Sequence, residues 1–177
     1  MKMLGTQACG EIAGIALPGN IVAYRMDWHN DDKHDDMRQM SGIDLGNCSC
    51  CDYFIILDRY VALVETTHLG GTVKRLEEEC KCMKMPEYGT KKYLRGEILR
   101  ENVMKVYGSL LMLCRLSAIC PSIKDGLKDK EYHIWIINES KPYEAYDLAL
   151  RLKSTFGRAV ANDIQIMSPI EMVEILK

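Results

Sequence analysis

The sequence predicts an α/β fold with a mixed (α+β) sheet, and three features support this class. Two apolar runs rich in β-branched and aromatic residues, 51–57 and 60–68, are separated by only two residues, which is typical of a β-hairpin. A short strand-like segment precedes them at 21–26, and an apolar stripe at helical spacing follows over 90–117. A further buried strand is predicted at 132–138. Because a helical crossover leads to it, this strand should lie parallel to one of the earlier antiparallel strands, in a sheet with helices on both faces.

Proline and glycine residues bound the other predicted elements. In chain order these elements are a helix over 7–17, a helix over 72–82, a helix over 143–156, a strand over 164–167 and a helix over 168–176. Pro121 ends the helix over 90–117, and Gly157 is a stop signal for the helix before it. The polar segment 27–47 begins with a run of acids and histidines, so we expect a mobile loop there, with a His/Asp metal site as the alternative.

Length and composition restrict the class of protein. A chain of 177 residues fits one fold, so we expect a single domain over 1–177. The net charge of −2 argues against a broad basic surface for nucleic acids but leaves room for a local groove. No apolar run approaches the roughly 18–20 residues that cross a bilayer, and residues 1–7 lack the pattern of a signal peptide. We therefore expect a cytoplasmic protein without a membrane segment.

The chain has eight cysteines, which is many for a cytosolic protein of this length. Four of them form two C-x-C pairs, Cys48 with Cys50 and Cys80 with Cys82, which resemble the two halves of a zinc or iron–sulfur site. The commoner spacing is C-x₂-C, so zinc on these four cysteines is a secondary hypothesis. The alternative is that the cysteines are small core residues or incidental.

Two acids stand in apolar strands where charge is unfavourable unless it is paired or bound. Asp52 lies at the start of the first strand of the hairpin, and Glu65 lies near the end of the second. In an antiparallel hairpin these two positions are neighbours at the same end of the sheet. Two carboxylates held together repel each other, and a divalent cation relieves that repulsion. The pair therefore predicts a metal site.

The order of elements, with acids at these two positions, resembles the PD-(D/E)XK nuclease-like superfamily, which has the restriction-endonuclease-like fold. The resemblance implies an α-β-β-β-α-β core, extended here by a C-terminal helix, strand and helix. Asp52 matches the Asp that begins the second strand of that core, and Glu65 matches the acid of the third. The resemblance further implies Mg²⁺ or Mn²⁺ bound by Asp52, Glu65 and the carbonyl of Thr66, with Glu11 on the first helix as a further metal ligand.

The sequence departs from the superfamily at the motif lysine, because Thr67 stands in its place. Strand alternation puts Thr67 on the same face as Glu65, but threonine cannot supply the ammonium that helps to activate the attacking water in such nucleases. Some superfamily members carry this lysine on the following helix. The lysines available for that role here are Lys74, Lys91 and Lys92, with Lys91 as the example we carry forward. His68 is a candidate proton-transfer group.

Two functions are compatible with these residues. The first is a metal-dependent nuclease, or a nuclease-derived nucleic-acid-processing protein, in which a metal-activated water attacks a phosphodiester of DNA or RNA. The second is a non-catalytic assembly or regulatory subunit of a nucleic-acid-handling complex, for which the missing lysine and the acidic charge argue. A homodimer or a complex subunit fits both. In a purely structural alternative, the two acids cap strand ends or pair with Arg75 or Arg95.

Overall fold

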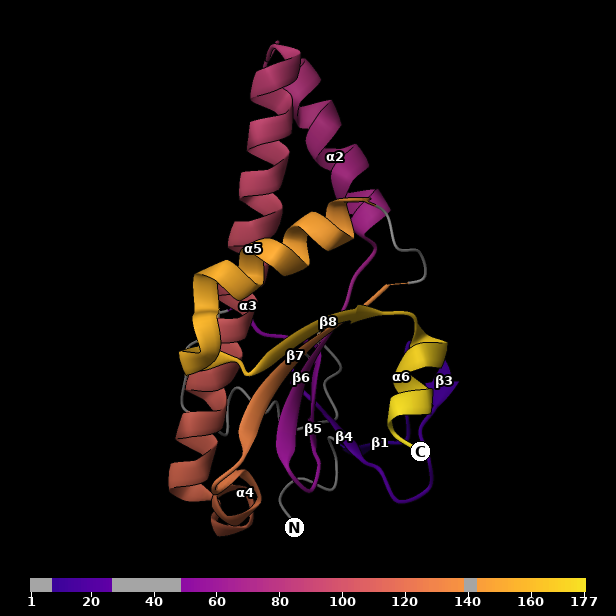
Figure 1. Cartoon of the computed structure of the whole chain (residues 1–177), viewed down its shortest axis with the longest axis vertical. Coiled ribbons are helices and arrows are strands. Elements are labelled where there is room, and N and C mark those ends of the chain that lie inside the picture. The colour runs from indigo at the N-terminus through magenta and orange to yellow at the C-terminus, as the bar shows by residue number, and fades with distance from the viewer. Residues whose placement is uncertain (1–7, 27–48, 139–142) are drawn as a thin grey trace, which may run out of the picture.

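The computed structural model describes residues 8–26, 49–138 and 143–177, and its centre is a six-stranded mixed sheet (Figure 1). The strands follow the order β1-β4-β5-β6-β7-β8, and β2 and β3 form a separate two-stranded sheet. The strand bounds are β1 Ala8–Cys9, β2 Glu11–Ile12, β3 Ile15–Ala16, β4 Ala23–Arg25, β5 Tyr53–Ile56, β6 Tyr60–Thr66, β7 Glu131–Ile137 and β8 Asp163–Met167. The predicted α/β class is therefore confirmed.

The direction of pairing changes at β6. Strands β4, β5 and β6 are antiparallel, with Ile55 opposite Ala62, whereas β7 runs parallel to β6 and β8 runs parallel to β7. Both the hairpin and the parallel strand after the crossover are as the sequence predicts. Strand β6 is thus hydrogen-bonded on both sides, and its residues 61–65 are all buried.

Helices cover both faces of the sheet. Their bounds are α2 Leu69–Cys82, α3 Glu87–Ile119, α4 Pro121–Leu127, α5 Tyr143–Val160 and α6 Pro169–Ile175. On one face, Leu63 and its neighbours in the sheet form a core with residues such as Leu113 of α3 and Leu152 of α5. On the other face, Val64 packs in a second core with Met172 of α6 and the β2–β3 hairpin. Glu65 follows the alternation of Leu63 and faces α3.

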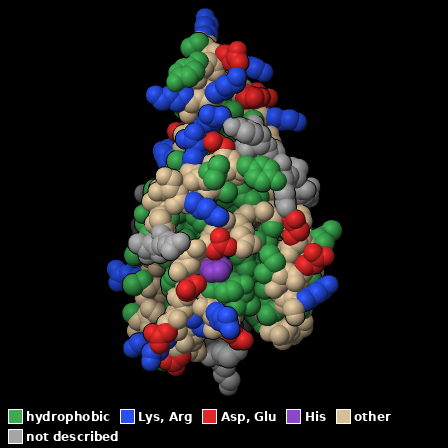
Figure 2. Space-filling view, in the orientation of Figure 1, with side chains coloured by type: hydrophobic (Ala, Val, Ile, Leu, Met, Phe, Trp, Pro, Cys, Tyr) green, Lys and Arg blue, Asp and Glu red, His purple; other side chains and the backbone are tan. Residues whose placement is uncertain are grey.

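Helices α2 and the first part of α3 form a hairpin that projects beyond the sheet, and α5 crosses α3 where this projection meets the body of the molecule (Figure 1). Basic and acidic side chains alternate over the projecting part, whereas hydrophobic side chains gather over the body below it (Figure 2). No helix in the described ranges is both long and apolar enough to span a bilayer.

Two secondary-structure predictions are wrong. The helix expected over 7–17 is replaced by β1 and the β2–β3 hairpin. Ala13 and Gly14, with φ of +51° and +74°, form the turn of that hairpin, and positive φ at both central residues is what a tight two-residue turn requires. The sequence also did not predict helix α4, which begins directly after α3. Pro121 follows the end of α3 and occupies the first turn of α4.

Other boundaries are close to those predicted. Gly157 interrupts α5 with a φ of +56°, which agrees with its reading as a stop signal. Gly70 and Gly71 lie inside the first turn of α2, so this helix begins three residues earlier than Thr72, at Leu69. The predicted loop over 27–47 lies outside the described residues.

Candidate functional site

Asp52 immediately precedes β5 and binds the end of β6. Its Oδ2 accepts a hydrogen bond from the backbone N–H of Thr66, with an N···O distance of 2.7 Å, and a second one from the Thr66 hydroxyl. Tyr53 is paired with Val64 in the sheet, so one further step of the same register sets Asp52 beside Glu65. The hairpin therefore brings the two acids together as the sequence predicts.

Glu65 is the one buried charged residue among those that the structure describes, with 4% of its surface exposed. Its Oε1 accepts a hydrogen bond and ion pair from the ammonium of Lys105 on α3. Its Oε2 is fully buried and has no hydrogen-bond partner in the described part of the chain. An unsatisfied buried carboxylate oxygen is unfavourable, so this atom needs an explanation in either structure or function.

Lys105 reaches Glu65 from the buried side of α3. Its side chain is 19% exposed, and its Nζ also lies 3.8 Å from Glu101 one turn earlier on the helix. Two acids, one buried and one exposed, therefore share one ammonium. The hydrophobic part of the lysine side chain is buried while its charged end meets the carboxylates.

Ser109 fixes the relative position of α3 and the start of β5. Its hydroxyl is completely buried, donates to the carbonyl of Lys105 over 2.8 Å, and accepts from the backbone N–H of Cys51 over 2.8 Å. Cys51 directly precedes Asp52. One side chain thus connects the backbone before the first acid to the helical turn that carries the lysine.

The charges in this cluster influence one another strongly. Burial, together with the nearby Asp52 carboxylate, raises the pKa of Glu65 to about 8 despite the opposing effect of Lys105. For Lys105, burial acts to lower the pKa, but the Glu65 and Asp52 carboxylates outweigh it and raise the pKa above its usual value. Lys105 is therefore charged at neutral pH, whereas the Glu65 carboxyl group holds its proton more firmly than an ordinary glutamate.

Thr67 and His68 line a hollow of about 240 Å³ at the end of β6, together with Asn138 and Pro169. Thr66, which donates two hydrogen bonds to Asp52, lines the same hollow, so the hollow adjoins the acid cluster at this residue. The backbone N–H of Thr67 donates to the carbonyl of Ile137 on β7. Strand β6 ends at Thr66, so alternation along the strand no longer decides where the side chain of residue 67 lies.

In the described part of the chain, the remaining candidate residues do not pair with the two acids. Lys91 is exposed and forms an ion pair of 2.7 Å with Glu87 on its own helix, so the lysine that contacts Glu65 is Lys105 and not Lys91. Arg75 pairs with Glu79, and Arg95 pairs with Asp147, so neither arginine is the partner of Asp52 or Glu65. Glu11 lies in the β2–β3 hairpin with an exposed side chain, not on a helix beside the acids.

Zinc binding by the cysteines gains no support from the described residues. Cys50 and Cys80 are buried in the same hydrophobic core, whereas Cys82 is exposed on α2. Cys48 lies outside the described residues. Within 8–26, 49–138 and 143–177, no three or more His, Cys, Asp or Glu side chains are grouped closely enough to hold a metal ion.

A cation site is therefore limited to two carboxylates and backbone oxygens. Asp52, Glu65 and the carbonyl of Thr66 are hard oxygen donors of the type that Mg²⁺ and Mn²⁺ accept, and these ions commonly keep several waters. The unpartnered Oε2 of Glu65 is the donor atom that fits such an ion. The donor set agrees with Mg²⁺ or Mn²⁺ and lacks the nitrogen and sulfur ligands typical of zinc.

Lys105 was missed as a candidate, although the sequence contains a signal for it. It lies seven residues after Ile98 and eleven after Leu94, on the apolar stripe of α3 that predicts the helix. A lysine on the buried face of a helix needs a buried partner. That reasoning, applied to the unpaired acids of the hairpin, would have favoured Lys105 over the lysines nearer the start of α3.

Comparisons with protein-family models, with curated proteins and with solved structures found no match to this chain.

Proposed function

We propose that this protein is a metal-dependent phosphodiesterase acting on nucleic acid, with Asp52, Glu65 and Lys105 as its catalytic group. The observation that carries the proposal is the ammonium of Lys105 on the Glu65 carboxylate, in a cluster that also contains Asp52. This arrangement supplies from α3 the cation that residue 67 lacks. Some members of the PD-(D/E)XK nuclease-like superfamily carry this lysine on the helix after the third strand, whereas Lys105 lies on α3, the second helix after β6.

The topology supports the same proposal. Strands β4, β5 and β6 form an antiparallel meander, a helical crossover follows, and β7 returns parallel to β6. This matches the β-β-β-α-β part of the superfamily core, and α5, β8 and α6 correspond to the extension at its C-terminal side. The first helix of that core has no counterpart in the described residues, where β1 to β3 precede the meander.

Each residue of the cluster has a defined role in this proposal. Asp52, Glu65 and the carbonyl of Thr66 would hold Mg²⁺ or Mn²⁺. Such an ion, when bound, lowers the pKa of a coordinated water and neutralises charge on the phosphate. The hydrogen bonds from Thr66 fix the orientation of Asp52. Lys105 would stabilise the negative charge that develops on the phosphate during attack.

The high pKa of Glu65 makes cation binding depend on pH. Because burial and Asp52 raise the pKa of Glu65 to about 8, a cation competes with a proton for this carboxylate near neutral pH. Lys105 remains charged and favours loss of the proton, because its ammonium stabilises the resulting carboxylate. Ion binding and deprotonation of Glu65 are therefore coupled.

A non-catalytic nucleic-acid-handling subunit is the second candidate, and one observation favours it. Glu65 is deeply buried and is paired with Lys105. The ion pair alone would then explain why both charged residues are present, as a structural contact within the core. In that case the cluster would hold α3 against the sheet and bind no ion.

Cleavage assays distinguish the two candidates. Single-stranded and duplex DNA and RNA are incubated with Mg²⁺ or Mn²⁺ and wild-type protein, Asp52→Ala, Lys105→Met, or Lys92→Met as a matched exposed lysine on the same helix. We expect wild-type cleavage, its loss with Asp52→Ala, a decrease of about 10²–10³-fold with Lys105→Met, and no change with Lys92→Met.

Calorimetry provides the independent measurement. Asp52→Asn is expected to weaken Mn²⁺ binding, because it removes a charged ligand. Absence of both cleavage and Mn²⁺ binding in the folded wild-type protein would contradict the proposal and favour the non-catalytic subunit.

A further inference from the structure

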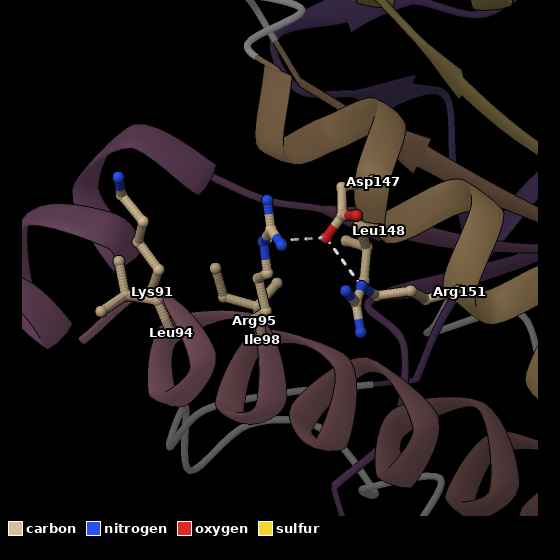
Figure 3. Close-up of a pocket in the computed structure, with 7 residues that line it drawn as sticks. All are labelled: Lys91, Leu94, Arg95, Ile98, Asp147, Leu148 and Arg151. Atoms are coloured by element: carbon tan, nitrogen blue, oxygen red, sulfur yellow. Dashed lines mark hydrogen bonds and ion pairs between the residues drawn. The ribbon is translucent and has the colours of Figure 1, made fainter. Parts of the chain in front are cut away.

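A pocket of about 320 Å³ lies between α3 and α5, apart from the acid cluster (Figure 3). Its charged residues are Lys91 and Arg95 of α3 and Asp147 and Arg151 of α5. Three of these four side chains are cationic, so the pocket is locally basic in a protein whose formal net charge is −2. A local concentration of positive charge in a concave site favours an anionic ligand.

Both arginines are held by the same carboxylate through the Nε of the guanidinium group. Asp147 Oδ2 accepts the Nε–H of Arg151 over 2.7 Å and lies 3.6 Å from the Nε of Arg95. Both guanidinium groups turn toward this one carboxylate (Figure 3). Each is engaged through Nε, and no ion pair with another described residue holds its terminal N–H groups. These groups can therefore donate to another acceptor, and the paired geometry suits the oxygens of a phosphate.

The remaining wall of the pocket is apolar. Leu94 and Ile98 of α3 and Leu148 of α5 line it beside the arginines. Inorganic phosphate has no apolar part that would use such a wall. A ligand with a charged group at one end and a flat, weakly polar body at the other would contact both parts of the pocket.

We propose that this pocket binds one nucleotide unit, with its phosphate on Arg95 and Arg151 and its base or sugar against Leu94, Ile98 and Leu148. The choice of a nucleotide over other organic phosphates rests on the proposed function. The nucleotide would come either from a nucleic-acid strand or from a free mononucleotide, since both present the same phosphate and base.

The position of the pocket along α3 favours a strand as the source. Leu94, Ile98 and Lys105 follow one stripe of the helix, and Ile98 is seven residues from Lys105, or about 10 Å along the axis at 1.5 Å per residue. Leu94 and Ile98 are themselves buried against the core, so a strand cleaved at Asp52, Glu65 and Lys105 would run outside this stripe and would reach the pocket within about three nucleotides at roughly 3.4 Å each. The pocket would then position the substrate and take no part in the chemistry.

Binding is measured without divalent cation, in EDTA, so that no cleavage occurs and the result does not depend on catalysis. The probes are a fluorescent single-stranded oligonucleotide, a nucleoside monophosphate and inorganic phosphate, each titrated with wild type, Arg95→Gln, Arg151→Gln and Arg100→Gln. Arg100 is the matched control, since it is an exposed arginine on α3 that pairs with Glu97 and does not line the pocket.

We expect Arg95→Gln and Arg151→Gln each to weaken oligonucleotide binding about tenfold or more, as for loss of a charged hydrogen bond, and Arg100→Gln to leave it unchanged. Loss of a phosphate contact should also make the slope of log affinity against log salt shallower by about 0.7. Arg95→Lys keeps the charge, so it should retain the slope while losing part of the affinity. Melting temperatures verify that each variant is folded.

The pattern across probes decides the source of the ligand. Oligonucleotide binding that is tighter than mononucleotide binding and depends on Arg95 and Arg151 supports a strand, and mononucleotide binding alone with the same dependence supports a free nucleotide. Three results would overturn the proposal. The first is equal affinity for inorganic phosphate and the mononucleotide, and the second is an equal loss of affinity in Arg100→Gln and Arg95→Gln. The third is an affinity that neither Arg95→Gln nor Arg151→Gln changes. Arginine-dependent binding without cleavage would contradict only the proposed function, whereas cleavage with no effect of the pocket variants would contradict only this inference.

Discussion

Helix α3 contributes a cation to each of two clusters, in which it pairs with a carboxylate from another element, and the clusters differ in burial and in partners. In the first, Lys105 contacts Glu65 in the core, and Glu65 keeps one buried oxygen without a hydrogen bond. In the second, Asp147 lies between Arg95 and Arg151, whose side chains are 43% and 41% exposed. Water reaches the second cluster and is largely excluded from the first.

The same kind of contact therefore has different consequences in the two places. Exposed ion pairs contribute roughly 0–1 kcal/mol to stability, because water screens the charges. A buried pair requires removal of two charges from water, and similar apolar residues often give equal or greater stability. A buried charged pair with one unsatisfied oxygen is thus poorly explained by stability alone, which is why the first cluster is our candidate for chemistry and the second for ligand binding.

The largest expected difference between the clusters is seen when one cation is removed. At pH 9, where the Glu65 carboxylate is charged in the wild type, Lys105→Met leaves that charge buried without a partner. We expect a loss of about 3–5 kcal/mol in the free energy of unfolding, measured by urea denaturation, and a smaller loss at pH 6, where Glu65 is protonated. An equal loss at both pH values would mean that packing of the lysine side chain, and not its charge, is what matters.

Replacement of the whole buried pair tests whether it is kept for stability. Glu65→Leu combined with Lys105→Met removes both charges and fills the same space. We expect stability equal to the wild type or up to about 4 kcal/mol higher, together with complete loss of cleavage. Urea denaturation and the cleavage assay measure the two effects. A double variant less stable than Lys105→Met alone would indicate that the ion pair is structural.

The pH dependence of cleavage follows from the raised pKa of Glu65. Only the carboxylate binds a cation, so activity should increase as pH rises toward about 8, by about tenfold per unit while Glu65 is mainly protonated, and then level off. The contribution of Glu65 to the free energy of unfolding changes with pH in the opposite direction to activity. This contribution is fully present below the ordinary glutamate pKa of about 4.5 and is lost as pH rises through about 8. Urea denaturation between pH 5 and pH 9 should show this decline in the wild type and not in Glu65→Gln.

The smallest effect is expected at the exposed cluster. Arg151→Gln removes one of two cations from a partly exposed carboxylate, so the free energy of unfolding should change by less than about 1 kcal/mol. Thermal and urea denaturation measure this change. A loss comparable with that of Lys105→Met would remove the distinction between the two clusters.

The sequence predicts most of the sheet, and physical reasons explain where it fails. Strands β5, β6 and β7 and the long helix have strong apolar periodicity, and these elements are confirmed. The segment 7–17 was predicted as a helix because its apolar residues are spaced ambiguously over a short length. Its turn at Ala13 and Gly14 decides the outcome, since two positive φ values cannot occur within a helix.

The candidate site is predicted in part for the same reasons. Asp52 and Glu65 come from one hairpin, where a local register determines which residues are neighbours. Lys105 comes from a helix whose rotation about its axis and position over the sheet depend on the packing of many side chains. Sequence spacing alone places a lysine on the buried stripe of α3, but only the tertiary arrangement pairs it with Glu65.

The separation of these residues along the chain has a consequence for the folding pathway. Asp52 contacts Thr66 at a separation of 14 residues, whereas Lys105 is 40 residues from Glu65. Closing the short loop is entropically easier, so the hairpin should form before α3 docks. During that interval two neighbouring carboxyl groups lack their ammonium, and a protonated Glu65 is the state that most easily leaves water. Docking of α3 should therefore be faster at pH 5 than at pH 9, which would make the refolding rate itself a reporter of the charge on Glu65.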